Sequence, residues 1–199
     1  EMRIDNENGA NNDGNYGVIQ ERLSVNAGVG DVSTWARLDA DIFLNKPTDQ
    51  FEQNLRAERL GVAWRLGNFT LQGGDFFQQL GRGIALNLRK LTGAGVDVSL
   101  QGAKVAYLGD THGFSIFGGR PNPANIDPVN QRFVEDPQDA MAGATYEVRP
   151  FASTRFGAYA LGLIPGERLV DDFADFTTTG GAWTDLPSLL SWLTLYAEL

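Results

Sequence analysis

Hydrophobic and polar residues alternate with a period of two along most of the chain, and long runs with a helical period are missing. The segment 34–44 shows this best, because its even-numbered positions from 36 onward are apolar while Arg37, Asp39 and Asp41 lie between them. Successive side chains of an extended strand point to opposite sides. The pattern therefore predicts an amphipathic strand with one apolar face and one charged face.

The same alternation recurs in other segments and predicts about ten strands. Glu21 interrupts one apolar face, Lys104 interrupts another, and Leu161 and Leu163 lie opposite the apolar face of their own segment. The predicted strands are 2–4, 18–27, 34–44, 58–66, 69–77, 96–108, 112–120, 140–149, 155–164 and 190–199.

Connections between these strands alternate in length. Short, turn-forming stretches occur at 28–31, 67–68, 109–110 and 150–153. The long connections are 5–15, 45–55, 78–95, 121–139 and 165–189, with 78–95 taken as a single excursion. This alternation is typical of outer-membrane barrels, which have short periplasmic turns and long external loops.

The fold class we predict is therefore all-β, an antiparallel up-and-down transmembrane β-barrel. Residues 1–199 form a single barrel domain or the N-terminal portion of one. The strand pattern continues up to Leu199, which is not the terminal aromatic residue with which outer-membrane barrels usually end. This favours the interpretation that the chain is part of a larger barrel.

Composition narrows the class of protein further. The chain has 199 residues, of which 42% are hydrophobic and 24 are glycine, with no cysteine. Glycine at this level favours many turns, and the absence of cysteine excludes disulfides and thiolate metal sites. The net charge of −9 and pI of about 4.5 make nucleic acid an unexpected partner, because phosphate binding needs a basic patch.

One segment resembles a known family. Gly74-Asp75-Phe76 is followed by Gly81-Arg82-Gly83 and then by Ala85-Leu86 and Leu88-Arg89-Lys90. This pattern resembles a motif of a poorly characterised family of large bacterial outer-membrane, porin-like β-barrel envelope proteins. Tyr16–Val18 leading to Glu21–Leu23, and Asn125–Asp127, are similar to that family as well. The resemblance covers most of this chain and the first part of a family member, and it implies an envelope location without an activity.

Candidate chemistry is sparse. His112 lies near Asp110 and Ser115, the residue types of a hydrolase triad, but His112 and Ser115 are three positions apart and are predicted to point to opposite faces of a strand. We expect no enzyme activity, and a rim histidine beside a tight turn is the favoured interpretation.

Two acidic regions raise the question of metal binding. Asp5, Glu7, Asn8 and Asp13 carry the hard oxygens that suit Ca²⁺, but the spacing of an EF-hand is missing and a solvated turn is the alternative. In 121–139 we expect arginine–carboxylate pairs that order the loop. Its charged residues are Asp127, Glu135, Asp136 and Asp139, with Arg120 and Arg132 nearby. No metal or cofactor is expected.

The charged strand faces are the best candidate functional surface, because they would line a barrel lumen. Mixed charges there would select permeants by charge, or pair across strands and stiffen a filled interior. Arg82 and Arg89 belong to the 78–95 connection, which would fold inward and narrow a pore or simply pack through its leucines. The candidates are Arg22, Arg37, Asp39, Asp41, Arg59, Arg65, Arg82, Arg89, Glu147, Arg149 and Arg155. Aromatic residues at strand ends would form interfacial girdles.

Three hypotheses follow from these patterns. The first is a porin-like channel or transport barrel in the bacterial outer membrane, in contact with outer-membrane lipid or lipopolysaccharide. The second is a structural barrel that docks envelope proteins through its long loops. The third is a soluble extracellular β-sandwich whose apolar faces pack together.

Overall fold

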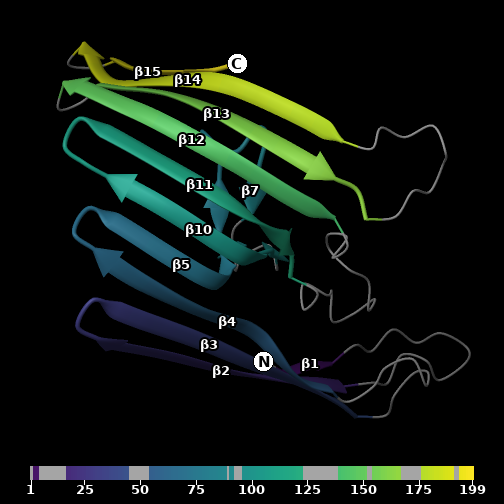
Figure 1. Ribbon diagram of the computed structural model, residues 1–199. Coiled ribbons are helices and arrows are strands. Elements are labelled where there is room, and N and C mark those ends of the chain that lie inside the picture. Colours follow the sequence, from purple (N-terminus) through teal and green to yellow (C-terminus); the bar gives the residue numbers. More distant parts are fainter. Residues whose placement is uncertain are drawn as a thin grey trace, which may run out of the picture.

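The computed structural model describes residues 2–4, 17–44, 54–88, 90–91, 96–122, 139–151, 154–166, 176–190 and 193–199. These residues form strands and connections, and among them no helix is long and apolar enough to cross a membrane. One antiparallel sheet dominates, with eleven strands in chain order (Figure 1). Its strands are β1 (Met2–Ile4), β2 (Gly17–Val29), β3 (Val32–Leu44), β4 (Asn54–Leu66), β5 (Phe69–Phe76), β10 (Leu100–Leu108), β11 (His112–Pro121), β12 (Ala140–Phe151), β13 (Thr154–Ile164), β14 (Thr177–Leu190) and β15 (Leu193–Glu198).

The predicted all-β antiparallel fold is therefore confirmed. Each strand pairs with its neighbour in the chain, and β5 pairs directly with β10. In the part of the chain that the structure describes, β1 and β15 are the edges of this sheet, and the sheet does not close into a barrel. The transmembrane barrel stays a prediction.

The segment between β5 and β10 is an excursion from the sheet. It contains four strands of two residues each, β6 (Gln78–Gln79), β7 (Asn87–Leu88), β8 (Lys90–Leu91) and β9 (Val96–Asp97), which pair as β6–β7 and β8–β9. We call the described residues of this segment, 77–88, 90–91 and 96–99, the excursion.

The short turns between β2 and β3, between β4 and β5, and between β10 and β11 lie at the same end of the sheet, on the left in Figure 1. The turn between β2 and β3 contains Gly30, and the turn between β4 and β5 contains Gly67, with φ of 57° and 58°. Glycine adopts this left-handed conformation without the steric cost that other residues incur. The turn between β10 and β11 spans Gly109 to Thr111.

The expected long connection 165–189 is wrong over most of its length, because residues 177–190 form β14 and the last strand begins at Leu193 instead of Leu190. The threonines and glycines at 177–181 resemble a loop in sequence. Threonine nevertheless favours strands, and Gly181 is required by packing, since a Cβ there would lie 2.5 Å from the Tyr159 ring. Pro187 is accommodated where the register between β14 and β15 shifts. Because of this additional strand, the main sheet has eleven strands, whereas the sequence predicts about ten.

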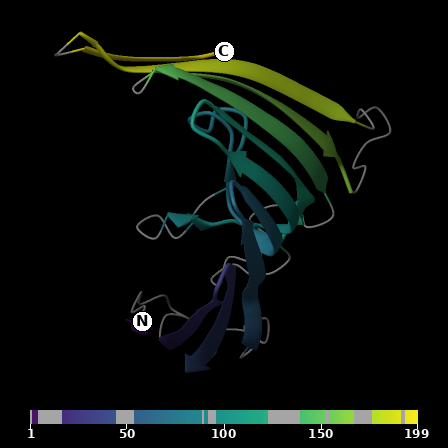
Figure 2. The same ribbon diagram turned by 60° about the vertical axis from the view of Figure 1, so that its left-hand side comes forward.

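The sheet is curved and its two faces differ (Figure 2). The excursion packs on the concave face, where Leu80 and Leu88 join Leu100, Phe117 and Tyr159 in the buried core. Lys104 lies opposite Phe117 in the register and thus also on the concave face. The apolar face that Lys104 interrupts, which also carries Leu100, is therefore the concave one. Leu161, predicted to lie opposite the apolar face of its strand, does so and packs against the concave core.

The convex face is apolar and exposed. It gathers large hydrophobic side chains that are between 37% and 84% exposed, and cross-strand partners such as Leu23 and Leu38, or Leu66 and Phe69, continue the apolar surface from strand to strand. The set comprises Leu23, Val25, Val29, Val32, Leu38, Ile42, Leu44, Leu60, Val62, Trp64, Leu66, Phe69, Val105, Ile116, Tyr146, Phe156, Ile164 and Leu195. Such a large exposed apolar surface marks a contact with lipid or protein.

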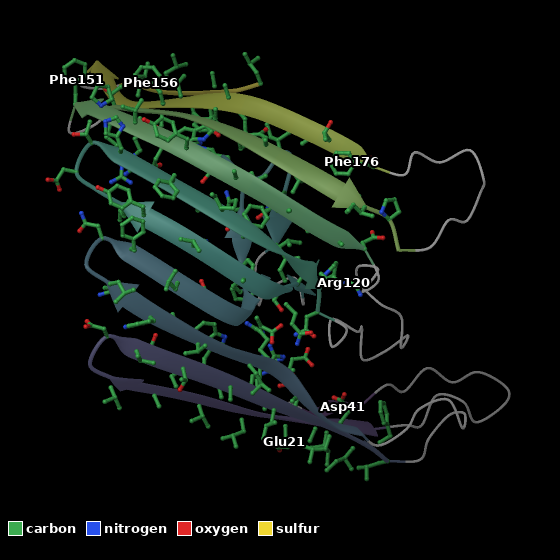
Figure 3. All side chains as sticks on the ribbon, in the orientation of Figure 1. Glu21, Asp41, Arg120, Phe151, Phe156 and Phe176 are labelled. Atoms are coloured by element: carbon green, nitrogen blue, oxygen red, sulfur yellow. The ribbon has the colours of Figure 1, made fainter. Side chains whose placement is uncertain are left out.

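Aromatic residues concentrate on the convex face near the short turns. Phe69, Tyr107 and Phe114 stand side by side on three neighbouring strands, with ring centroids of Phe69 and Tyr107 4.9 Å apart and those of Tyr107 and Phe114 5.5 Å apart. Phe156 lies at the same end (Figure 3). Charged residues of the convex face, Glu21 and Arg120, lie instead toward the long connections (Figure 3).

Candidate functional site on the concave face

The excursion crosses the concave face from the middle of the sheet to its last strand. It leaves β5 after Phe76, and its tip at 81–84 reaches Tyr196 and Glu198 of β15. Two leucines of the excursion point toward the sheet, where Leu80 is fully buried and Leu88 is 6% exposed. Leu86 and Leu88 pack on the core as one interpretation of this segment expects, whereas Ile84 is 75% exposed. The narrowing of a pore stays a prediction.

A buried polar cluster holds the root of the excursion. The ladder between β4 and β5 ends at Gly61 and Gly74, and beyond it the Asp75 carboxylate accepts a hydrogen bond of 2.8 Å from the Leu60 main-chain N–H. The Asn122 amide donates to the other Asp75 oxygen at 2.6 Å. We call Asp75, Ser99 and Asn122 the root cluster.

The root cluster links four parts of the chain. Asn122 also donates its side-chain amide to the Glu58 carbonyl at 2.7 Å, and its main-chain N–H donates to the Ser99 carbonyl at 3.0 Å. Asp75 precedes the excursion and Ser99 ends it, so both of its ends are fixed to β4 and to the end of β11. Gly74 has a φ of 92°, and a Cβ there would lie 2.3 Å from the Leu60 carbonyl oxygen. This position therefore requires glycine.

A second polar cluster holds the tip. The Glu198 carboxylate accepts a hydrogen bond of 2.9 Å from the Arg82 main-chain N–H and one of 3.2 Å from the Tyr159 hydroxyl. The Tyr196 hydroxyl also donates to Glu198, and the Arg82 guanidinium lies 3.9 Å above the Tyr196 ring. We call Tyr159, Tyr196 and Glu198 the tip cluster.

Two glycines allow the carboxylate to approach the tip so closely. Gly81 and Gly83 have φ of 52° and 97°, and a Cβ at Gly81 would lie 2.5 Å from a Glu198 oxygen. Main-chain N–H groups in such a turn converge on an anion. The Gly81-Arg82-Gly83 segment therefore binds a carboxylate of its own chain.

Replacing Glu198 with alanine is expected to increase tryptic cleavage after Arg82 by roughly 10- to 100-fold. Hydrogen bonds to a charged group stabilise by about 1.5–3 kcal/mol, and cleavage follows the population of the opened tip. The fragment ending at Arg82, quantified by mass spectrometry, measures the effect. Glu147→Ala is the control, because Glu147 is paired with Arg149 on the same face. Equal cleavage in both variants would show that Glu198 does not hold the tip.

Several predicted lumen residues form one ion-pair group on the concave face. Asp39 is 9% exposed and accepts hydrogen bonds from the guanidinium groups of Arg37, at 2.7 Å, and Arg22, at 3.3 Å. Asp41 is buried on the same face. The two arginines share the Asp39 carboxylate, and Arg22 is the cross-strand partner of Asp39 in the register of β2 and β3. The three side chains lie on one face, as the strand alternation predicts.

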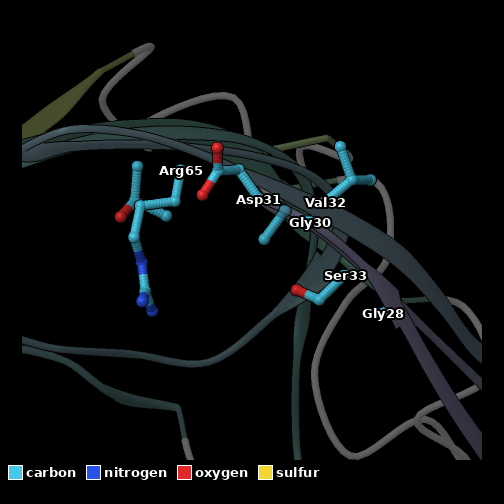
Figure 4. Close-up of a pocket in the computed structure, with 8 residues that line it drawn as sticks. Gly28, Gly30, Asp31, Val32, Ser33 and Arg65 are labelled. Carbon is cyan, nitrogen blue, oxygen red and sulfur yellow. The ribbon is translucent and has the colours of Figure 1, made fainter.

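The other predicted lumen residues are spread over the concave side. The Arg59 guanidinium lies 4.8 Å above the Phe77 ring, and Glu147 forms an ion pair with Arg149. Arg155 is exposed on β13. Arg65 lines a pocket of about 180 Å³ beside the turn that contains Asp31 (Figure 4).

His112 and Ser115 lie on opposite faces of β11. His112 is exposed, and its Nδ1 lies 2.7 Å from the Tyr146 hydroxyl. The Ser115 hydroxyl is 2.8 Å from that of Thr145 on the concave side. The two residues therefore do not form the nucleophile–base pair of a triad.

Other predictions fall on residues outside the described ranges. These include Arg89, the candidate calcium ligands Asp5, Glu7, Asn8 and Asp13, and most of the acidic connection 121–139. At the end of that connection, Asp139 accepts a hydrogen bond of 3.0 Å from the Gly166 N–H. Within the described ranges no group of three or more His, Cys, Asp or Glu residues is arranged to hold a metal ion.

Comparison with known proteins adds no family. No protein-family model matches this chain, and a search of curated proteins gives no match. The functional argument therefore rests on the geometry of the two faces and of the excursion.

Proposed function

We propose that this sheet is a membrane-spanning sector of an outer-membrane β-barrel that passes solutes, with the excursion as its constriction. The observation that carries the proposal is the contrast between the faces. The convex face exposes a continuous apolar surface, while buried ion pairs and polar clusters lie on the concave side. This is the distribution expected of a sheet with lipid outside and a polar lumen inside.

The lengths of the strands and the aromatic residues near their short turns support a bilayer crossing. A tilted transmembrane strand needs about 9–11 residues, and β2, β3 and β4 have 13 each. Aromatic residues favour the membrane interface, which matches the row of Phe69, Tyr107 and Phe114 near the short turns. Because short turns are usually periplasmic, the long connections would face outward.

The excursion has the properties of a constriction. It is fixed at its root by Asp75 and at its tip by Glu198, so it spans the hollow of the sheet between two anchored ends. Its tip presents Arg82 and Ile84, both exposed, the latter by 75%. Solutes in a lumen would pass these side chains.

The first test is the electrophoretic mobility of the full-length protein recovered from outer membranes, with and without boiling. A heat-dependent shift and recovery in the outer-membrane fraction are expected. Recovery of the soluble protein without a shift would contradict the proposal and favour the soluble β-domain.

Conductance in a planar bilayer then tests solute passage. These 199 residues contain no cysteine, so Ile84→Cys places the one thiol among them at the tip of the excursion. Modification with a bulky thiol reagent is expected to reduce the conductance of Ile84→Cys and to leave that of Leu23→Cys, on the convex face, unchanged. Channels that are equally unaffected in both variants would remove the excursion from the conduction path.

A docking barrel is the second candidate, because the complete burial of Leu80 under the excursion is also typical of a filled interior. A protein that shows the heat-dependent shift but no conductance would support this candidate. Partner proteins of the envelope would then bind through the long connections.

A further inference from the structure

The convex face contains a groove where β11, β12 and β13 lie side by side. Three small residues at one register, Gly118, Ala142 and Gly162, form its floor. A Cβ at Gly118 would have no atom nearer than 3.7 Å, so the floor is open to the outside at this position. The groove has a volume of about 790 Å³ and a largely apolar lining.

Larger side chains border this floor. Ile116 lines the groove from β11, and Ile164 and Phe176 line it from the β13–β14 side. The Phe176 ring covers Gly162, because a Cβ there would lie 2.8 Å from the ring. The groove is therefore a bordered depression in a surface that elsewhere carries large apolar side chains.

The floor follows β12 along its outward-facing alanines, Ala140, Ala142 and Ala144. At about 3.3 Å per residue these positions cover roughly 13 Å, the length of about ten methylene groups. Tyr146 occupies the next outward-facing position. A linear apolar slot of this length fits an extended acyl chain.

A cation lies at the end of the groove nearer the long connections. Arg120 lines the groove, is exposed, and shares the outward side of β11 with Ile116 and Gly118. Asp139, the acidic residue at the same end of β12, does not line the groove, and its carboxylate accepts the Gly166 N–H. Arginine binds phosphate through paired N–H donors.

We infer that this groove binds one acyl chain of a phosphate-bearing membrane lipid, with the lipid phosphate beside Arg120. The inference rests on the proposed membrane location and adds a defined lipid site to it. The apolar slot recognises the chain and Arg120 recognises the anionic headgroup, which lies at the level of the rim.

The test uses the full-length protein in detergent micelles, titrated with phosphatidylglycerol and followed by native mass spectrometry. Ala142→Leu fills the groove with a side chain that still suits a lipid-facing position, and Arg120→Gln removes the charge. Each is expected to reduce lipid retention about tenfold. Ala36→Leu, an apolar enlargement elsewhere on the convex face, and Arg120→Lys are the matched controls and are expected to retain the lipid.

Two further probes identify what is bound. Retention of diacylglycerol, which has the acyl chains but no phosphate, is expected to fall in Ala142→Leu and to be unchanged in Arg120→Gln, and inorganic phosphate is expected not to compete. Wild-type retention in both variants would overturn the inference, as would a change of oligomeric state in Ala142→Leu without loss of lipid. If every variant keeps the heat-dependent shift, such a result rejects the lipid site alone. Loss of the shift in the unmodified protein would reject the barrel itself.

Discussion

Leu60→Arg is expected to destabilise the protein in a lipid bilayer by about 2–4 kcal/mol, the cost of a lipid-facing arginine near the midplane of a barrel. Leu60 lies midway along β4 on the convex face and is 53% exposed. Urea unfolding of the full-length protein in phospholipid vesicles measures the effect.

The control for Leu60→Arg is an arginine substitution at a different depth in the membrane. Val29 is more exposed than Leu60, at 84%, but it lies beside the turn at Gly30. Val29→Arg is therefore expected to cost only about 0–1 kcal/mol, because the penalty falls toward the interface. If the two variants are destabilised equally, or neither is affected, the convex face does not contact lipid.

Asp75→Ala is expected to lower the free energy of unfolding by roughly 2–4 kcal/mol. The substitution removes the acceptor for the Leu60 N–H and the Asn122 amide, and Asp75 is only 2% exposed. A buried donor without an acceptor costs about 1–3 kcal/mol. The same unfolding measurement in vesicles reports the loss.

Asp110→Ala, at the exposed turn between β10 and β11, is the matched control and is expected to change stability by less than about 0.5 kcal/mol. Asp75→Asn keeps one carbonyl oxygen and is expected to fall between the wild type and Asp75→Ala. A loss in Asp75→Ala no larger than that of the control would show that water or another group replaces the carboxylate.

The two faces of most strands were predictable because a period of two assigns each side chain directly to a side. Arg37, Asp39 and Asp41 lie together on the concave face as 34–44 suggests. At Leu100 and Leu161 the concave face is apolar instead of polar, since the excursion covers part of that face and provides an apolar environment there. Local alternation carries no information about a distant segment that packs on the same surface.

β14 was missed for a related reason. Its threonines and glycines have no apolar alternation, and the need for glycine at 181 comes from Tyr159 of the neighbouring strand. The root and tip clusters were missed as well. Glu198 and Arg82 are 116 residues apart. Nothing in the sequence around either residue predicts that the two are in contact.

Neighbouring strands of the sheet are also neighbours in the chain, so the sheet can grow by adding one hairpin at a time. Contacts between residues close in sequence form early because the entropy lost in closing their loops is small. The contact between Arg82 and Glu198 joins the excursion to the last strand of this sheet, so it must form late. Until β15 is in place, the excursion is held by its root cluster and by the packing of Leu80 and Leu88 on the earlier strands, and its tip has no partner on Glu198.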